Sequence, residues 1–597
     1  MPSAAKSGIR RAALLRLPSP KREEYPVDWF VLLTLPLLLA VLASGRVNPA
    51  VAFFTLAAAF MLGGLVSTEA FLASFTNPAL ATLVVLLLVS TVIERSPLLH
   101  RLSGKILVGD EKRAFLRLTG ISTLLSAFMN NTAVVSTFLV TLTRQQKIPP
   151  SRLLIPLSYA SILGGITTLI GTSTNLVVNS FVESAGLPPL RMFQFSAVGI
   201  PVALACLAVL YWRMHALPAN RNSSQDLKNT YFITAAVLPE ADIAGKSIAE
   251  SGLKRLDGLY LVEIRRDNYL ISPVAPLERI RPGDQLVFSG AIDHIGGLQA
   301  IRGLNILGEQ ASDLLASNLV EAVITHESGL VYKTLQEIDF RGRFNAGVVG
   351  IRRGNKRLTG NLANTILHVG DSLILAVGEN FRADPGQFHI LSESHTPPHL
   401  NSRQGNRAIA GFLLAILLET LNLLPLLHGL LILLGACLLA GYTSLRELKQ
   451  RIPFELITII GSAIAIAKAM DNSGAAQLIG ACVQHLFHDS GTWAAFAGIY
   501  LMTLVTTEII TNNAAAALAI PVALSTAQAM HASPTPFVMA VAYGASACFI
   551  LPFGYQTHLM VYSPGCYTMR DYLRTGIPVS LTYSALVLLL TPLVFPF

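Results

Sequence analysis

The sequence predicts a polytopic α-helical membrane protein made of two similar halves, with a polar α/β region inserted between them. Three observations support this fold class. The chain of 597 residues is 52% hydrophobic but only 13% charged, and its apolar runs approach the ~20 residues that a helix needs to cross a bilayer. These runs stop near residue 218 and resume near residue 405. The motifs of the first half recur in the same order in the second.

Ten apolar runs are expected to cross the membrane, five before the insert and five after it. They lie near residues 29–45, 49–67, 78–94, 152–181 and 194–214, and near 408–425, 427–445, 453–470, 536–562 and 573–595. An odd number of crossings in each half would give the halves opposite orientations, which is the arrangement of an inverted repeat. We therefore expect a first repeat at 28–218 and a second at 405–597. A cytoplasmic insert would place most basic loops inside but the basic tail, residues 1–27, outside, against the usual rule.

The composition and motifs argue against several classes of function. The formal charge of +9 does not indicate a nucleic-acid partner, because the Lys and Arg residues lie mostly in short loops beside apolar runs, where they set membrane orientation. The five cysteines show no CxxC spacing and no matching histidines, so we expect no zinc site. No nucleophile with a base and an orienting group stands out, and no G-x-G-x-x-G follows a strand in the insert, so we do not expect an enzyme.

Two polar tips interrupt the apolar texture. "MNNTAVVSTFLVT" at 129–141 is echoed by "TNNAAAALAIPVA" at 511–523. Each arm around the first tip has about 15 residues, or ~22 Å as a helix, which is short of a ~30 Å hydrocarbon core. We therefore expect re-entrant helical hairpins at 114–145 and 493–530 instead of crossings.

Two polar breaks follow the tips. "LIGTSTNLVV" at 169–178 is echoed by "PFGYQTHLMV" at 552–561. Paired discontinuous segments in corresponding positions indicate the binding site of a transporter. The helix N-termini at the tips offer free N–H groups to an anion, and uncharged oxygens nearby suit a desolvated Na⁺. For any single polar residue, hydrogen bonding between membrane helices is an equal alternative.

The insert is itself duplicated. "IRRDN" from Ile264 aligns with "IRRGN" from Ile351, and the offset of 87 residues also relates "GDQLVF" to "GDSLIL". The pattern resembles the C-terminal regulator-of-potassium-conductance module, TrkA-C, in two tandem copies at 222–310 and 311–400. That resemblance implies a cytoplasmic α/β module that dimerises and sometimes binds a regulatory ligand.

The arginines of the repeated motif are the candidates for that ligand. A regulatory nucleotide read by Arg265, Arg266, Arg352 and Arg353 is expected for the set, while for any one of these arginines a solvated basic face is the favoured interpretation. A ligand-gated ion channel is a lesser alternative, because the chain lacks a TVGYG filter and a four-fold set of pore segments.

The tips and breaks together resemble the divalent anion:sodium symporter family (DASS) of the ion transporter superfamily. The resemblance implies an elevator-type, Na⁺-coupled symporter of a small divalent anion, working as a homodimer in the inner (plasma) membrane. The implied substrate-binding residues are Asn131, Thr132, Ser173, Thr174, Asn512, Asn513, Gln556 and Thr557. The implied Na⁺ ligands come from Ser126, Asn130, Asn131, Gly171, Thr507, Thr511, Asn512 and Gly554.

The chain departs from the family's Ser-Asn-Thr tips and Pro-Pro-Asn breaks. The departures are Asn130, Asn513, Ser173-Thr174, Gln556-Thr557 and His558. They leave the substrate open, with sulfate favoured over a C4 dicarboxylate, and leave Na⁺ and H⁺ as alternative coupling ions.

Four ionisable residues lie in or near the expected spans, and each has more than one interpretation. Intramembrane Glu508 is either functional or bonded to nearby backbone, with the second favoured. Lys468 and Asp471 are explained by snorkelling or a local ion pair, and His558 by anion binding, proton sensing or packing.

Overall fold

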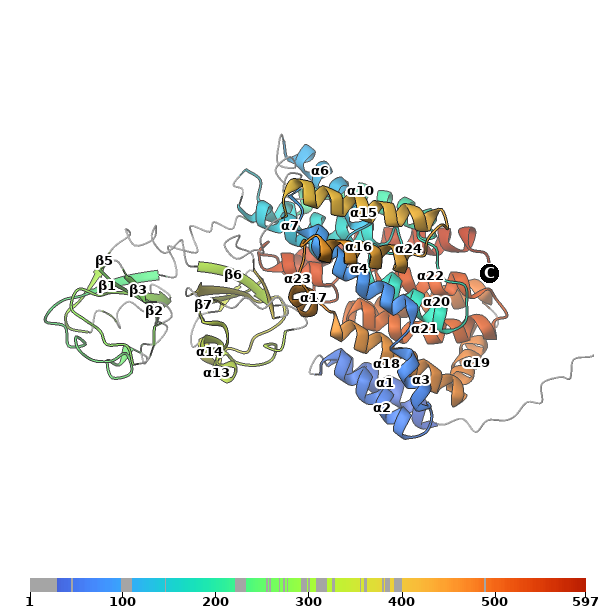
Figure 1. The fold of residues 1–597 in the computed structure, drawn as a ribbon, viewed down its shortest axis with the longest axis horizontal. Helices are drawn as coiled ribbons and strands as arrows, with labels where there is room; N and C mark the ends of the chain where they lie inside the picture. Colours follow the sequence, from blue (N-terminus) through green and yellow to red (C-terminus); the bar gives the residue numbers. More distant parts are fainter. Residues whose placement is uncertain are drawn as a thin grey trace, which may run out of the picture.

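The structure is a computed structural model of the chain. It describes residues 29–597 except 45–46, 98–109, 145–146, 221–231, 391–399 and 488–489, and except gaps between residues 254 and 386. The expected N-terminal tail, 1–27, lies outside the described residues. The described chain forms a helical part from the two terminal halves and a strand-rich part from the insert (Figure 1).

Helices of the first half follow the predicted runs. They are α1 (Trp29–Ala43), α2 (Pro49–Leu62), α3 (Thr68–Ser74), α4 (Pro78–Glu94), α6 (Glu111–Ser126), α7 (Asn131–Arg144), α8 (Leu154–Gly165), α9 (Ser173–Ser184) and α10 (Ser196–Trp212). Helices α2 and α4 start alike, because Asn48 and Asn77 each accept a bond from a backbone N–H two residues on and a proline follows each of them.

Helices of the second half repeat this order. They are α15 (Ser402–Thr420), α16 (Leu426–Leu439), α17 (Leu445–Gln450), α18 (Phe454–Asn472), α19 (Ala475–Phe487), α20 (Gly491–Ile509), α21 (Asn512–Ala529), α22 (Pro534–Ala545), α23 (Gln556–Tyr562) and α24 (Met569–Val594). The predicted span at 152–181 is two helices, α8 and α9, and the predicted span at 536–562 is also two, α22 and α23. Both interruptions lie at the polar breaks.

The lengths of the hairpin arms differ between the halves. Helices α6 and α7 have 16 and 14 residues, close to the predicted 15, whereas α20 and α21 have 19 and 18. Among the described residues, three segments are long and apolar enough to cross a membrane, Thr68–Glu94, Gly491–Ile509 and Met569–Val594. One of them is an arm of the second hairpin, so length alone identifies only the first hairpin as too short to cross.

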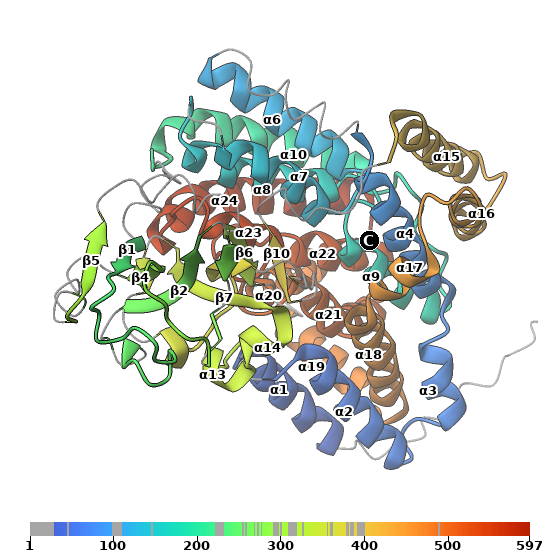
Figure 2. The same cartoon turned by 60° about the vertical axis from the view of Figure 1, so that its left-hand side comes forward.

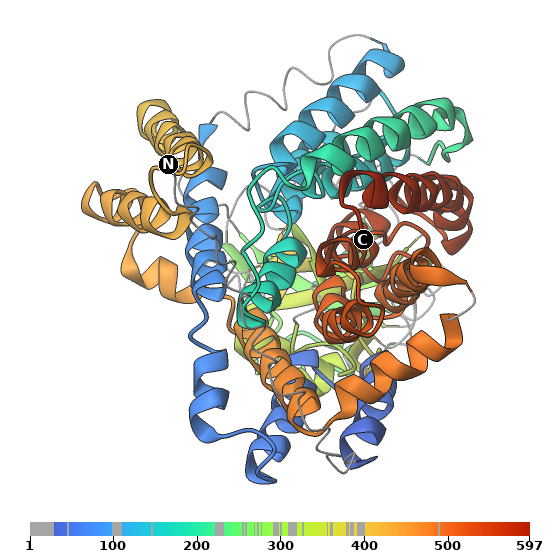
Figure 3. The same cartoon turned by 90° about the vertical axis from the view of Figure 1, so that its right-hand side faces the viewer.

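The two halves interlock (Figure 3). Helix α2 of the first half packs on α18 of the second, and α16 packs on α4. In each half the hairpin packs on the helix that precedes the break, as α6 does on α8 and α20 on α22. The pairs α9 with α21 and α7 with α23 join each break to the hairpin of the other half.

The insert forms two five-stranded antiparallel sheets of equivalent topology. The first has the order β3-β2-β4-β1-β5, and the second has β10-β6-β9-β7-β8, which is the same order read from the other edge. The strands of the first sheet are β1 (Phe232–Val237), β2 (Leu259–Arg266), β3 (Tyr269–Ile271), β4 (Gln285–Gly290) and β5 (Leu304–Leu307). Those of the second are β6 (Leu319–Ile324), β7 (Ala346–Arg353), β8 (Lys356–Leu358), β9 (Ser372–Val377) and β10 (Phe388–Ile390).

The sequence offset recurs in the strands. The first four strands of each sheet start 87 residues apart, and each long strand carries a bulge at the same place, Leu261/Glu263 in β2 and Val348/Gly350 in β7. Each sheet has its own hydrophobic core. We name the two units the first and second modules. The second module lies between the first module and the helical part (Figure 1).

Candidate functional site

The first tip lies where α6 turns into α7. Asn130 caps α7, because its side-chain oxygen accepts a bond from the Thr132 N–H at 3.0 Å. The capping residue is thus Asn130, the first asparagine of the Asn130-Asn131 pair. The Asn130 side-chain oxygen is therefore directed at backbone, which weakens the prediction that it serves Na⁺.

Asn131 is buried among groups from α6, α8 and both breaks. In the amide orientation that satisfies every neighbour, its nitrogen donates to the carbonyl oxygens of Ser161 (3.0 Å) and Gly171 (3.2 Å) and lies 2.5 Å from the Ser126 hydroxyl. Its oxygen accepts from the Tyr555 hydroxyl at 2.7 Å. The first tip thus touches both breaks, through Gly171 of the first and Tyr555 of the second.

Glycines let the first break approach the tip. A Cβ on Gly165 would lie 2.7 Å from the nearer terminal atom of the Asn131 amide, and a Cβ on Gly171 would lie 2.6 Å from the Gly165 carbonyl oxygen. Distances that short do not occur for real side chains, so both positions require glycine. Gly171, a predicted Na⁺ ligand, is therefore at the tip with its carbonyl directed at Asn131.

The second tip meets the first break. Thr511 is the N-cap residue of α21 and makes no side-chain cap bond. The Asn512 amide donates to the Thr174 hydroxyl at 2.6 Å. The Asn513 oxygen accepts from the hydroxyls of Ser173 (3.1 Å) and Thr174 (3.3 Å). All four of these predicted substrate residues are in mutual contact.

The first tip meets the second break in the same way. The Thr132 hydroxyl donates to the Gln556 side-chain oxygen at 3.2 Å, and Tyr555 binds Asn131 and also lies 3.2 Å from the Thr172 hydroxyl. Each tip is thus bonded to the break of the opposite half. The described contacts of both tips are amides, hydroxyls and backbone groups.

Two predicted residues lie behind this contact layer. The Thr557 hydroxyl is buried against the Ser158 hydroxyl at 2.9 Å, and the Thr507 hydroxyl donates to the Ala545 carbonyl at 2.7 Å. A Cβ on Gly554 would collide with the Thr507 carbonyl oxygen, so this glycine allows close packing. The structure therefore gives Thr557 a contact with α8 and none with a tip, which does not match its predicted place in the substrate site.

Glu508 anchors the second break. Its carboxylate accepts bonds from three consecutive backbone N–H groups, those of Phe549 (3.0 Å), Ile550 (2.9 Å) and Leu551 (2.8 Å). These amides lie in the non-helical segment between α22 and α23, where no helix supplies acceptors, so the carboxylate satisfies three backbone donors. Of the two interpretations of Glu508 from the sequence, the structure agrees with the favoured one, a hydrogen-bonded carboxylate that holds nearby backbone.

His558 and Lys468 also have structural partners. The His558 ring donates from Nε2 to the Cys548 carbonyl and accepts at Nδ1 from the Ser158 hydroxyl, both at 2.7 Å, and the ring is fully buried. Lys468 donates to the Ala70 carbonyl (3.3 Å) and the Ser74 hydroxyl (3.4 Å) of α3. The burial of His558 is therefore accounted for by its packing and its two hydrogen bonds, and the position of Lys468 by its contact with α3.

A small cavity opens beside the first tip, between the tip and α4. Its lining combines apolar side chains, mainly of α4, with a few polar residues. The polar or glycine residues of the lining are Ser90, Asn130, Gly171 and Ser173. Three of these four are residues that the sequence assigned to the Na⁺ or substrate sites.

The arginines expected to read a nucleotide are engaged within the protein. Arg265 pairs with Glu263 (3.1 Å) and Arg352 with Glu321 (2.9 Å). Arg266 forms a fork with Asp284, which raises the pKa of the Arg266 guanidinium. The Arg353 guanidinium forms a fork of the same geometry with Asp371. The prediction that these arginines read an anionic ligand is therefore not supported, because carboxylates occupy them.

The predicted binding residues leave out several residues of the contact layer. Tyr555, Thr172 and Ser161 bond the tips or each other across the halves. Tyr555 stands directly before Gln556 in the second break, so its position in this motif could have identified it as a site residue. No local pattern indicated Ser161, which lies within α8.

Helices that repeat in two halves, with a polar layer buried where they break, define a membrane transporter. The chain belongs to the family described as citrate transporters, whose model matches residues 37–595. An uncharacterized transporter of Synechocystis sp. is 30% identical over 563 residues, covering 90% of this chain and 92% of the relative.

Two further relatives have named substrates. Sodium/sulfate cotransporter 1 of Chlamydomonas reinhardtii is 28% identical over 369 residues, which is 58% of this chain and 41% of that protein. Na(+)/dicarboxylate cotransporter 3 of Mus musculus is 27% identical over 141 residues, 23% of each chain. The family and these relatives agree with the predicted resemblance to sodium-coupled anion symporters.

Proposed function

We propose that this protein is a Na⁺-coupled symporter of a small divalent anion, with sulfate favoured. The observation that carries the proposal is the exchange of contacts between halves, in which each tip bonds the break of the other half. A site of this kind opens when one hairpin moves against the opposite break. It is supported by relatives named for sodium/sulfate cotransport.

The electrostatics of the tips favours an anionic substrate. Helices α7 and α21 start at the two tips, so their free N–H groups and positive dipole ends are directed at the contact layer. Hydroxyl and amide donors of Thr132, Ser173 and Asn512 add neutral hydrogen bonds. The anion would be held by hydrogen bonding and dipoles, with Na⁺ supplying the compensating charge.

The architecture proposed for this function is an inverted repeat. It is supported by the equal order of helices in the halves and by the reciprocal pairs α2 with α18 and α16 with α4. Movement of the hairpins and breaks against a dimeric scaffold of the other helices, in the plasma membrane, completes the elevator proposal. The two modules, which we propose are TrkA-C-like and cytoplasmic, would regulate it.

The proposed Na⁺ ligands are oxygens beside the tips. The Ser126 hydroxyl and the Gly171 carbonyl lie next to Asn131 in the first half. In the second half the Thr507 and Gly554 backbones approach each other, and Thr511 and Asn512 complete the proposed set. Neutral oxygens in a desolvated setting suit Na⁺.

Uptake into proteoliposomes tests the proposal. Labelled sulfate is offered with and without a Na⁺ gradient, and with competing C4 dicarboxylates. We expect Na⁺-dependent sulfate uptake that Asn131→Ala or Asn512→Ala abolishes, while Asn472→Ala, whose amide bonds the Leu65 carbonyl away from the tips, leaves it intact. Uptake indifferent to Na⁺ would refute sodium coupling and make a proton gradient the next driving force to test.

A C4-dicarboxylate transporter is the second candidate. The relative named for Na⁺/dicarboxylate cotransport favours it. Stronger competition by succinate than by unlabelled sulfate in the same assay would select it.

A further inference from the structure

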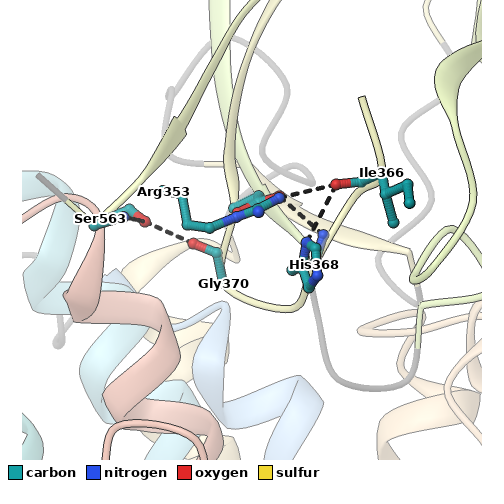
Figure 4. Close-up of polar contacts among 7 residues, drawn as sticks. Arg353, Ile366, His368, Gly370 and Ser563 are labelled. Atoms are coloured by element: carbon teal, nitrogen blue, oxygen red, sulfur yellow. Dashed lines mark hydrogen bonds and ion pairs between the residues drawn. The ribbon is translucent and has the colours of Figure 1, made fainter. Parts of the chain in front are cut away.

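The second module is seated on one end of α23. Ser563, the residue after α23, is fully buried. Its hydroxyl donates to the Gly370 carbonyl at 2.6 Å and accepts from the Gly354 N–H at 3.2 Å. Two turns of the second module, one at Gly354 and one at Gly370, are therefore bonded to a single side chain of the helical part. Figure 4 shows the bond between Ser563 and Gly370. We name this contact of three residues the joint.

The other end of α23 belongs to the candidate site. Tyr555 and Gln556, at its start, bond Asn131 and Thr132 of the first tip. The helix has seven residues, or about 10 Å of length. One short rigid element thus has the joint at one end and the tip contacts at the other.

The turn at Gly370 is braced from within the second module. The Arg353 guanidinium binds Asp371 with two bonds of 2.7 Å and donates to the Ile366 carbonyl at 2.9 Å. Asp371 in turn accepts from the His368 N–H at 2.8 Å. Figure 4 shows this brace beside the Gly370 carbonyl that receives the Ser563 bond. The joint therefore connects α23 to a stiff turn.

The first module provides a natural comparison. It has the same brace, because Arg266 binds Asp284 and the Arg279 carbonyl. Its counterparts of the two joint glycines, Asp267 and Gly283, are both exposed. Asp267 adopts a φ of 52°, close to the 59° of Gly354. An aspartate is therefore compatible with this turn of the module, and glycine is required only where the joint forms.

The space at Gly354 explains that requirement. A Cβ there would lie 2.8 Å from Cε1 of the Tyr562 ring and 2.9 Å from the Tyr567 carbonyl oxygen. At Gly370 it would lie 3.0 Å from the Leu559 side chain. All three neighbours belong to α23 or the loop after it. Side chains at these turns would push α23 and the second module apart.

We propose that the second module regulates transport through α23. Seated on Ser563, it holds α23 so that Tyr555 and Gln556 stay bonded to the first tip, and release of the joint loosens those bonds. This inference rests on the proposed function, because it assigns a regulatory role to the same tip and break. The first module, whose equivalent turns are exposed, does not make this contact through them.

Gly354→Asp tests the coupling, because it gives the second module the residue that the first module carries at the same turn. Asp267→Gly is the matched control, and Ser563→Ala removes both bonds of the joint without adding bulk. Hydrogen exchange of the full-length protein in lipid nanodiscs is followed by mass spectrometry. We expect faster exchange at 556–567 and at 129–133 in Gly354→Asp and Ser563→Ala, and no change in Asp267→Gly.

Uptake kinetics provide the second readout. We expect KM for the transported anion to rise about 3- to 10-fold in Gly354→Asp, as for the loss of one hydrogen bond, with no change in Asp267→Gly. Unchanged exchange at 129–133 while 556–567 exchanges faster would overturn the coupling, and so would an equal response of the control. If the wild type carries neither sulfate nor a dicarboxylate, the proposed function fails, but the exchange experiment still decides whether the joint controls the tip.

Discussion

Tyr555 links the two halves at the level of single residues. Its hydroxyl reaches the Asn131 side chain at 2.7 Å and lies 3.2 Å from the Thr172 hydroxyl. The Asn131 amide nitrogen donates to two backbone carbonyls, and its oxygen accepts from the Tyr555 hydroxyl. The orientation of the amide therefore depends on this hydroxyl. A buried amide with this many partners is costly to leave unpaired.

Tyr555→Phe is expected to weaken substrate binding. The ring remains, but Asn131 loses a hydrogen bond worth about 0.5–1.5 kcal/mol, so KM should rise about 2- to 10-fold. The check is uptake kinetics in proteoliposomes. Tyr583→Phe is the control, since its hydroxyl is also buried and donates to the Tyr543 carbonyl of α22 at 2.9 Å. A KM that stays at the wild-type value in Tyr555→Phe would show that the phenol does not organise the tip.

The sequence predicted where polarity breaks the apolar runs but not which polar groups meet. Asn131, Asn512 and Ser173 stood out because each lies in a repeated motif. Their partners were not predicted, because the pairing of one tip with the break of the other half depends on contacts several hundred residues apart. The occupied arginines were misjudged for a different reason. Asp284 and Asp371 are only 18 residues from Arg266 and Arg353, but the pairing of β2 with β4 and of β7 with β9 is what brings each carboxylate to its arginine.

At the scale of elements, the two breaks are stabilised differently. In the second break the Glu508 carboxylate holds three backbone N–H groups. In the first, the Asn175 amide spans the break and donates to the Thr168 carbonyl at 2.8 Å, and the Thr168 hydroxyl donates to the Ala127 carbonyl. The equal order of the motifs therefore conceals unequal chemistry, which a comparison of the motifs alone does not reveal.

Glu508→Gln is expected to loosen the second break. A carboxamide has one acceptor oxygen, so the Leu551 N–H would face an NH₂ group and lose a charge-assisted bond of about 1.5–3 kcal/mol. The apparent melting temperature of the purified protein should fall by several degrees. Thr506→Val in the same helix is the control, because its hydroxyl bonds only the Met502 carbonyl one turn away. A melting temperature equal to that of the wild type would show that the amides are satisfied in another way.

At the scale of the whole molecule, α23 connects the parts. The second module lies beside the helical part and the first module lies beyond it (Figures 1 and 2). The strands β4 and β7 place the two modules in contact. Among the described residues, a change in the first module can therefore reach the helical part through the second module. The joint at Ser563, beside the contact of Arg352 with Cys566, connects that module to α23 and so to a tip.

Replacing residues 222–399 with a Gly/Ser linker of about 20 residues is expected to leave a folded transporter with a weakened tip contact. The helical halves interlock without the insert, so uptake should persist, and KM should rise to the value of Gly354→Asp. In this background Ser563→Ala should have no further effect, because its partners are gone, while Tyr555→Phe should still raise KM, because its partner Asn131 remains. Such a loss of additivity is the signature of two changes that act through one contact. Kinetics identical to those of the full-length protein would contradict regulation of transport by the modules and would indicate another role for them.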